Sequence, residues 1–151
     1  LVGTAIQSYL YRSRTDIEQL VDLGMRIRLV KGAYQEPQSI AYQQKSDVDQ
    51  QYLQQMKILL ARGNFPAIAT HDEAMIQAAC TFVRDHGISK SVFEFQMLYG
   101  IRRDLQEKLV KQGYNMRVYV PYGSQWYPYL MRRMAERPAN LGFVLKNMFR
   151  G

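Results

Sequence analysis

The sequence has very little cysteine and no long apolar run, and both scarcities exclude whole classes of protein. Cys80 is the single cysteine, so the chain has neither an internal disulfide framework nor a CxxC metal or redox motif. No apolar run reaches the ~18 residues that a membrane-spanning helix needs. We interpret Cys80 as a small, buried, apolar residue of a helix, in a protein from a reducing compartment.

Motifs for binding nucleotides and nucleic acids are also missing. No GxGxxG or Walker sequence opens a predicted helix, which leaves a Rossmann or P-loop fold without support. The net charge is +7, from 20 basic and 13 acidic residues, but the basic residues are spread along the chain. Because no Lys/Arg-rich segment occurs, we expect no nucleic-acid partner. An anionic small ligand, or a weak attraction to an anionic membrane surface, fits this charge better.

Short β-rich runs alternate five times with longer segments of helical periodicity. We predict strands over residues 2–10, 27–30, 67–70, 92–96 and 116–120. We predict helices over residues 15–23, 47–61, 72–86, 102–112, 125–137 and 139–149. The spacing of Thr15 and Glu18 suggests a capping box at the first helix, and the polar segment between Tyr34 and Asp47 suggests a long loop. Alternation of this kind is typical of an α/β fold with a parallel sheet.

A TIM-type (β/α)8 barrel is the expected architecture, with residues 1–151 supplying about the last five units of a single catalytic barrel. Five units do not close a barrel of eight, so we expect the other three in an upstream segment. The chain opens directly on strand-like sequence without an initiator Met, which favours the same interpretation.

In such barrels the chemistry lies at the carboxyl ends of the strands. The predicted strand ends share a content of polar and aromatic side chains. They are Gln7 and Tyr9, residues 31–34, residues 70–72, residues 96–99 and residues 119–122. One such end would be an ordinary loop, but five together favour a functional edge.

One face of the predicted helix 125–137 carries Tyr129, Arg132, Arg133 and Glu136 at helical spacing. Adjacent arginines repel each other, and Glu136 supplies one negative charge. A bound carboxylate would supply another, because the planar guanidinium matches it with two parallel hydrogen bonds. From the spacing alone, this carboxylate site and a solvated basic face remain equally good interpretations.

Four segments, in order, resemble the signature motifs of the FAD-dependent proline dehydrogenase family, in its bacterial single-function form. They are residues 28–34 (RLVKGAY), residues 69–71 (ATH), residues 93–100 (FEFQMLYG), and residues 118–123 (VYVPYG) followed by 126–140 (WYPYLMRRMAERPAN). The resemblance covers nearly the whole chain. It implies a TIM-barrel flavoenzyme of proline catabolism that oxidises L-proline to Δ1-pyrroline-5-carboxylate. Hydride passes from proline C5 to flavin N5, and electrons then pass to a membrane quinone.

The resemblance also implies roles for individual residues. Arg132 and Arg133 are expected to grip the carboxylate of proline, with Glu136 as their acidic partner. The expected walls of the proline pocket are Tyr119, Tyr129, Leu98 and Tyr34. The expected FAD contacts are Gln7, Arg28, Lys31, Gly32, Ala33, Thr70, His71 and Gln96.

The chemistry of three of these residues agrees with a flavin site. Arg28, expected at a strand end, would stabilise a reduced flavin anion, and the small Gly32 and Ala33 would let the backbone approach the ring. No cluster of further His, Cys or Asp residues accompanies His71 at the spacing of metal ligands, so we expect no bound metal.

The family places a lysine and an aspartate in the upstream units, so we expect the 151-residue chain alone to be inactive. We expect a cytoplasmic protein with peripheral contact to the inner face of the cell membrane. The competing hypothesis is a non-redox TIM-barrel enzyme, such as an aldolase-like lyase, that binds a carboxylate metabolite through Arg132 and Arg133. That enzyme would need a Schiff-base lysine in an apolar strand interior, and Lys31 is the one candidate.

Overall fold

Five parallel strands and four α-helices alternate along the chain in a computed structural model that describes residues 2–120 and 122–123. The strands are β1 (Gly3–Gln7), β2 (Arg26–Val30), β3 (Ala67–Ala69), β4 (Glu94–Leu98) and β5 (Asn115–Tyr119). The helices are α1 (Ser13–Asp22), α2 (Lys45–Arg62), α3 (Glu73–Asp85), the 3-10 turn η1 (Lys90–Val92) and α4 (Arg103–Lys111). The predicted helices 125–137 and 139–149 lie outside the described residues.

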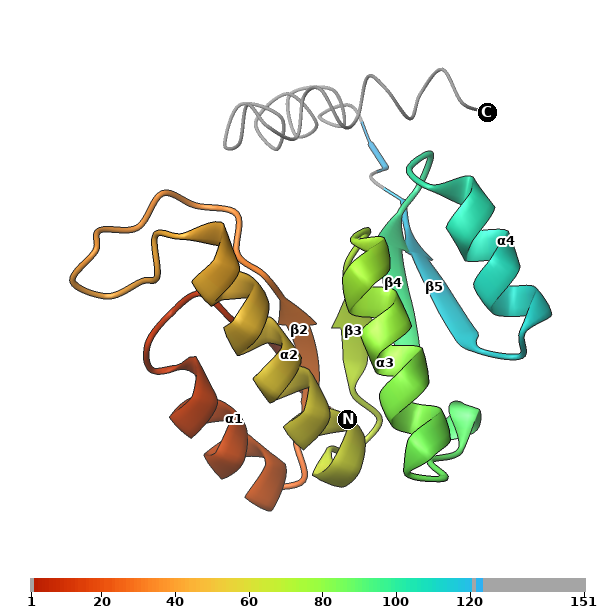
Figure 1. Ribbon diagram of the computed structural model, residues 1–151, viewed down its shortest axis with the longest axis horizontal. Helices are drawn as coiled ribbons and strands as arrows, with labels where there is room; N and C mark the ends of the chain where they lie inside the picture. The colour runs from red at the N-terminus through yellow and green to blue at the C-terminus, as the bar shows by residue number, and fades with distance from the viewer. Residues whose placement is uncertain (1, 121, 124–151) are drawn as a thin grey trace.

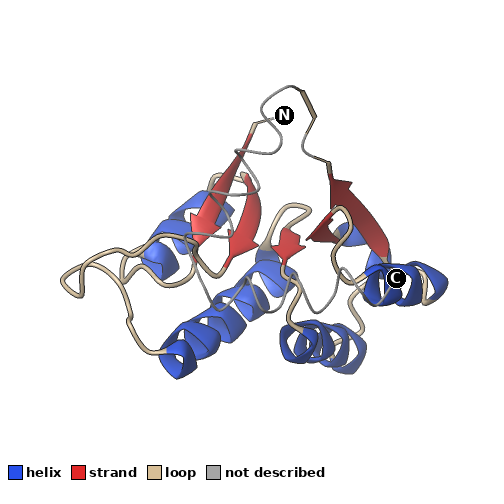
Figure 2. Cartoon of the chain, turned by 90° about the horizontal axis from the view of Figure 1, so that it is seen from above, coloured by secondary structure: helices blue, strands red, loops and turns tan. Residues whose placement is uncertain are grey.

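The sheet has the strand order β1-β2-β3-β4-β5, and every neighbouring pair is parallel. The α-helices follow the strands and cover one face of the sheet (Figure 1). Seen from above, the strands form an arc, with the helices on its convex side (Figure 2). This arc is the arrangement of part of a (β/α) barrel, so the predicted fold class is confirmed.

Several predicted boundaries are wrong by a few residues. The first strand ends at Gln7 rather than at residue 10, and α1 begins at Ser13. Thr15 therefore does not cap this helix. Instead the Ser13 hydroxyl donates to the carbonyl oxygen of Gln7 over 2.5 Å, which ties the helix to the end of β1. The fourth strand begins two residues later than predicted, because the turn η1 takes up Lys90–Val92.

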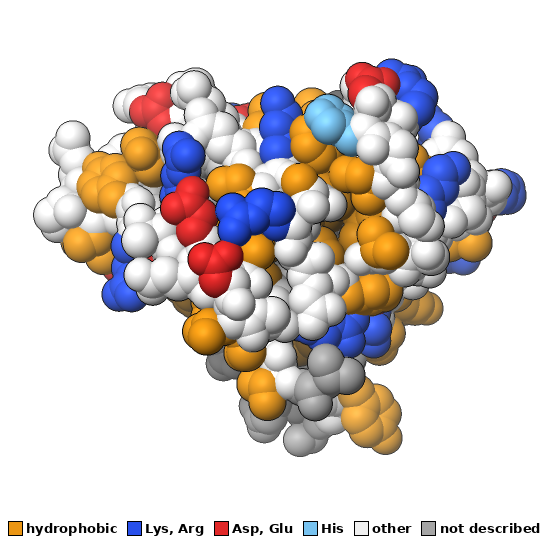
Figure 3. Space-filling model, turned by 90° about the horizontal axis from the view of Figure 1, so that it is seen from below, with side chains coloured by type: hydrophobic (Ala, Val, Ile, Leu, Met, Phe, Trp, Pro, Cys, Tyr) orange, Lys and Arg blue, Asp and Glu red, His pale blue; other side chains and the backbone are white. Residues whose placement is uncertain are grey.

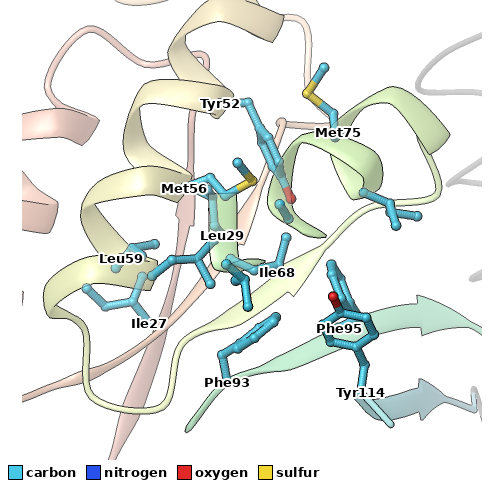
Figure 4. Close-up of a cluster of buried hydrophobic side chains, with 14 of the residues drawn as sticks. Ile27, Leu29, Tyr52, Met56, Leu59, Ile68, Met75, Phe93, Phe95 and Tyr114 are labelled. Atoms are coloured by element: carbon cyan, nitrogen blue, oxygen red, sulfur yellow. The ribbon is translucent and has the colours of Figure 1, made fainter. Parts of the chain in front are cut away.

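The core lies between the sheet and the helices. Ile27, Leu29 and Ile68 project from the strands against Met56 and other residues of α2 (Figure 4). Phe93, Phe95 and Tyr114 pack edge to face, with ring centroids 5.4–5.9 Å apart. Cys80 is half-buried against this core, close to the apolar role predicted for it. Because side chains alternate along a strand, the residues between these core positions face the concave side of the arc.

The long loop predicted after the second strand is present and packs against the first unit. The backbone N–H of Tyr42 donates to the carbonyl oxygen of Tyr9 over 2.8 Å. The Tyr11 hydroxyl donates to the Gln38 carbonyl oxygen over 2.7 Å. These bonds hold the loop beside the carboxyl end of β1.

None of the described helices is long and apolar enough to span a membrane. Figure 3 shows the end of the molecule at which the strands begin. Basic and acidic side chains are interspersed there with apolar ones. Ion pairs such as Arg62–Asp22, at 2.8 Å, reduce the field of the basic residues there. The net positive charge is therefore not concentrated in one block on that surface.

Candidate active site

The carboxyl ends of the five strands meet at one edge of the sheet, because all five are parallel. Nine of the residues predicted for the site lie at this edge. They are Gln7, Lys31, Gly32, Ala33, Tyr34, Thr70, His71, Leu98 and Tyr119. Four other predicted residues lie outside the described residues, so the structure does not place the predicted carboxylate site. They are Tyr129, Arg132, Arg133 and Glu136.

Arg28 and Gln96 lie deeper than this edge, on the concave face. Arg28 is the central residue of β2, so its predicted position at a strand end is wrong. In register with it stand Ala5 on β1 and Ala67 on β3, which are too small to cover its guanidinium. The face is hollowed there by an open cavity of about 410 Å³. Its lining includes Ala5, Arg28, Ala67, Glu94, Gln96 and Arg117.

Glu94 and Arg117 form an ion pair inside this hollow, and neither residue was predicted for the site from the sequence. Arg117 Nε and Nη2 donate to the two carboxylate oxygens over 2.8 and 2.9 Å, and Gln96 Nε2 donates to Oε1 over 2.6 Å. Burial alone would raise the pKa of Glu94, but the hydrogen bonds from Arg117 and Gln96 outweigh it and hold that pKa below its usual value. The alternation along residues 94–98 would have placed Glu94 on the face of Gln96.

His71 follows β3 and is fixed by the backbone of β4. Its Nε2 accepts a hydrogen bond from the Leu98 N–H over 2.8 Å. Burial lowers the pKa of His71 to about 4, and the charges of Arg102 and Arg28 act in the same direction. The imidazole is therefore neutral near pH 7, with its proton on Nδ1, where it can donate to a ligand.

Lys31 follows β2 and is held by two carboxylates. Its Nζ donates to Asp49 on α2, and to Oδ2 of Asp72 over 2.7 Å. Asp72 also caps α3 by accepting from the Ala74 N–H over 3.0 Å, while its own N–H donates to the Thr70 hydroxyl over 3.1 Å. This network ties the ends of β2 and β3 to α2. An ammonium paired in this way does not lie in an apolar strand interior, so the lyase hypothesis loses the lysine that it requires.

Gly32 is required by the packing of Tyr9 at the same edge. Its φ is +120°, and an added Cβ would lie 2.4 Å from Tyr9 Cδ1. From the sequence, the small size of Gly32 was expected to let the backbone approach a ligand closely. The buried Tyr9 ring gives it a reason within the fold.

Two of the residues predicted to line the substrate pocket, Leu98 and Tyr119, are neighbours in the sheet. Leu98 and Tyr119 are register partners, each the last residue of its strand. Tyr34 and Tyr119 are about half exposed. Among the described residues, no group of His, Cys, Asp or Glu side chains is placed to hold a metal ion.

A family model described as proline dehydrogenase matches residues 1–146. The proline dehydrogenase of Deinococcus radiodurans is 55% identical over 150 residues, which cover 99% of this chain and 48% of that protein. The chain belongs to the proline dehydrogenase family.

Other members of the proline dehydrogenase family extend this similarity. Proline dehydrogenase 2 of Bacillus subtilis is 52% identical over 147 residues, covering 97% of this chain and 48% of that protein. The chain therefore spans about half the length of the curated relatives it matches. Among solved structures, proline utilization A from Bdellovibrio bacteriovorus superposes with a TM-score of 0.80 at 32% identity, over 87% of this chain and 16% of that one. The five-strand arc is thus a partial TIM-type barrel of this family.

Proposed function

We propose that this chain is part of an FAD-dependent proline dehydrogenase that oxidises L-proline to Δ1-pyrroline-5-carboxylate in proline catabolism. The family match over residues 1–146 carries the proposal. The polar carboxyl edge supports it, because catalytic groups of TIM-type barrels concentrate there. The paired state of Lys31 disfavours the alternative non-redox enzyme.

The groups at the edge and on the concave face suit a flavin. Arg28 has small alanine neighbours and offers a cation for a reduced flavin, and Gln96 offers an amide. His71 offers an N–H donor at Nδ1. We also propose Gln7, Lys31, Gly32, Ala33 and Thr70 as contacts of FAD. FAD held there would supply the redox chemistry, as the acceptor of a hydride from proline and the donor of electrons to a quinone.

The substrate contacts of this proposal come from the carboxyl edge and from the segment after it. Arg132 and Arg133 bind the carboxylate of proline through bidentate hydrogen bonds, and Glu136 balances their charge. Tyr34, Leu98, Tyr119 and Tyr129 form the walls of the pocket. The register pairing of Leu98 with Tyr119 supports a continuous wall, because neighbouring strands of a sheet lie about 4.8 Å apart. Positioning of the ring is the main contribution of these residues.

We propose a cytoplasmic protein that touches the inner face of the cell membrane, where the quinone resides. The net charge of +7 supports a weak attraction to anionic lipid. Sedimentation of the complete protein with vesicles of phosphatidylglycerol, compared with neutral phosphatidylcholine vesicles, tests the contact. Equal binding to both would remove the electrostatic argument.

The experiment for the activity uses the complete protein, including its upstream segment. Addition of L-proline without oxygen should bleach the absorbance of bound flavin, and a soluble quinone should restore it. Bound flavin that does not respond to proline would contradict the proposal. Borohydride in the presence of a carbonyl substrate should trap no adduct on Lys31, whereas an aldolase-like enzyme would be modified there.

The 151-residue chain by itself should be inactive. Among the described residues, β1 and β5 each pair with one strand only, so the pocket has one wall and the sheet has two open edges. Purified alone, the chain should show no proline-dependent bleaching. Adding the upstream segment should restore it, and a bleaching response from the isolated chain would contradict this expectation.

A further inference from the structure

Glu94 and Gln96 lie two positions apart on β4, so their side chains share the concave face of the sheet. The Gln96 amide nitrogen donates to Glu94 Oε1 over 2.6 Å. The neighbouring strand β5 contributes the third member, Arg117. It is the register partner of Gln96 and donates hydrogen bonds to both carboxylate oxygens of Glu94. The three side chains form one hydrogen-bonded unit across β4 and β5.

The chemistry of the carboxylate determines which way the Gln96 amide is turned. An ionised carboxylate only accepts hydrogen bonds, whereas an amide carries both a donor nitrogen and an acceptor oxygen. Facing Glu94, Gln96 must therefore present its nitrogen. Its oxygen points away from the carboxylate, and no hydrogen bond to that oxygen occurs within residues 2–120 and 122–123.

Burial makes this orientation strict. The Glu94 side chain is 8% exposed, although its partner Arg117 is 62% exposed. Little water reaches the carboxylate to replace the amide, and turning Gln96 around would place two acceptors against each other. Glu94, a buried acidic residue at the start of β4, is thus tied to Gln96, the next residue of the same face toward the carboxyl edge.

We propose that Glu94 is a positioning residue that fixes the Gln96 amide so that its oxygen accepts a hydrogen bond from an N–H group of bound flavin. The inference rests on the proposed function, in which Gln96 contacts FAD. The oxidised isoalloxazine ring has a single N–H, at N3, between two carbonyl groups. A fixed acceptor matches that N–H, whereas a freely turning amide would present either of its two groups.

The complete protein and its Glu94→Gln variant test this role. Glutamine at this position can donate as well as accept, so the Gln96 amide is no longer held in one orientation. We expect FAD affinity, measured by flavin fluorescence on adding FAD to the apoprotein, to fall roughly 3- to 10-fold, as for one weakened hydrogen bond. The flavin absorption band should also shift. Glu94→Asp, which keeps the charge but shortens the side chain, should change both in the same direction.

Two further variants separate positioning from a purely structural ion pair. Arg117→Met removes the ion pair but leaves the Glu94–Gln96 bond, so it should lower FAD affinity less than Glu94→Gln does. In a Gln96→Met background, Glu94→Gln should cause no further loss, because the side chain through which it acts is gone.

Three results would overturn the proposal: wild-type FAD affinity in Glu94→Gln, an equal loss in Arg117→Met, or a full additional loss in the Gln96→Met background. Failure of the proposed function is distinguishable from these. In that case the wild-type protein itself would not bind FAD, or its flavin would not respond to proline, and both proposals would fall together.

Discussion

The backbone N–H of Leu98 donates to Nε2 of His71 over 2.8 Å and joins the last residue of β4 to the loop after β3. This bond occupies the lone pair of Nε2, so the neutral ring carries its proton on Nδ1. The backbone N–H of β4 thus determines that His71, in the loop after β3, offers a donor at the carboxyl edge rather than an acceptor.

The stability of the complete protein should fall between about pH 6.5 and pH 4 because of His71. Its pKa is lowered from 6.5 to about 4, so the unfolded chain takes up a proton in this range before the folded protein does. The free energy of unfolding should decrease as the pH falls, by at most roughly 3 kcal/mol. Urea unfolding at pH 5 and pH 7 measures this, and His71→Asn should remove most of the difference.

The second histidine provides the control for that experiment. His86 is exposed at the end of α3, where Nδ1 lies 2.9 Å from the Phe82 carbonyl oxygen. His86→Asn should keep the pH dependence of the wild type. An identical slope in the wild type and in His71→Asn would contradict the assignment to His71.

Gly32→Ala should destabilise the protein more than Gly123→Ala. The two glycines have similar φ values, +120° and +113°, so alanine meets backbone strain of ~1–3 kcal/mol at either position. A Cβ at Gly32 would also collide with the Tyr9 ring, adding ~1–3 kcal/mol, whereas no atom of the described residues lies within 4 Å of one at Gly123. Chemical denaturation measures both costs. In a Tyr9→Ala background the excess at Gly32 should vanish, and its persistence would rule out the ring as the cause.

Lys31→Met should make the protein sensitive to acid. Burial would raise the pKa values of Asp49 and Asp72, but the hydrogen bonds from Lys31 outweigh it and lower both. Stabilisation from a lowered carboxyl pKa is present above the unfolded value near 3.8 and is lost as the pH falls through the folded value. Without Lys31 the pKa values rise, so the midpoint of acid unfolding should move to higher pH.

The loss of stability at pH 7 in Lys31→Met should be about 1–3 kcal/mol, because two half-buried carboxylates lose their shared cation. Lys45→Met is the matched control. Lys45 also pairs with Asp49 but is 81% exposed, so its removal should cost less than ~1 kcal/mol. Circular dichroism during acid titration measures both variants, and equal shifts would contradict a special role for Lys31.

Arg132→Met and Arg133→Met should each weaken proline binding in the complete enzyme without releasing FAD. A charge-assisted hydrogen bond contributes ~1.5–3 kcal/mol, which corresponds to roughly 10- to 100-fold in the dissociation constant. Titration of the oxidised holoprotein with a non-reactive carboxylate analogue measures the change. Arg103→Met, on the exposed surface of α4, should bind the analogue normally. Unchanged affinity for the analogue in both Arg132→Met and Arg133→Met would remove these arginines from the site.

The alternation of strands and helices was predictable from local pattern, because hydrophobic periodicity and helix-ending glycines act within a few residues. The edge of the sheet that carries polar side chains was predictable for the same reason. The boundaries of β1 and α1 were not, because the Ser13–Gln7 contact competes with the capping pattern of Thr15.

The sequence by itself determined the parallel α/β class, the order of its units and the residues that stand at the strand ends. Only the tertiary structure decided what those residues contact. Lys31 meets carboxylates 18 and 41 residues away, and Glu94 meets Arg117 from the next strand. Strand register decides which side chains become neighbours. Burial removes water from the charged groups, so each must pair with a charged or polar group that packing places beside it.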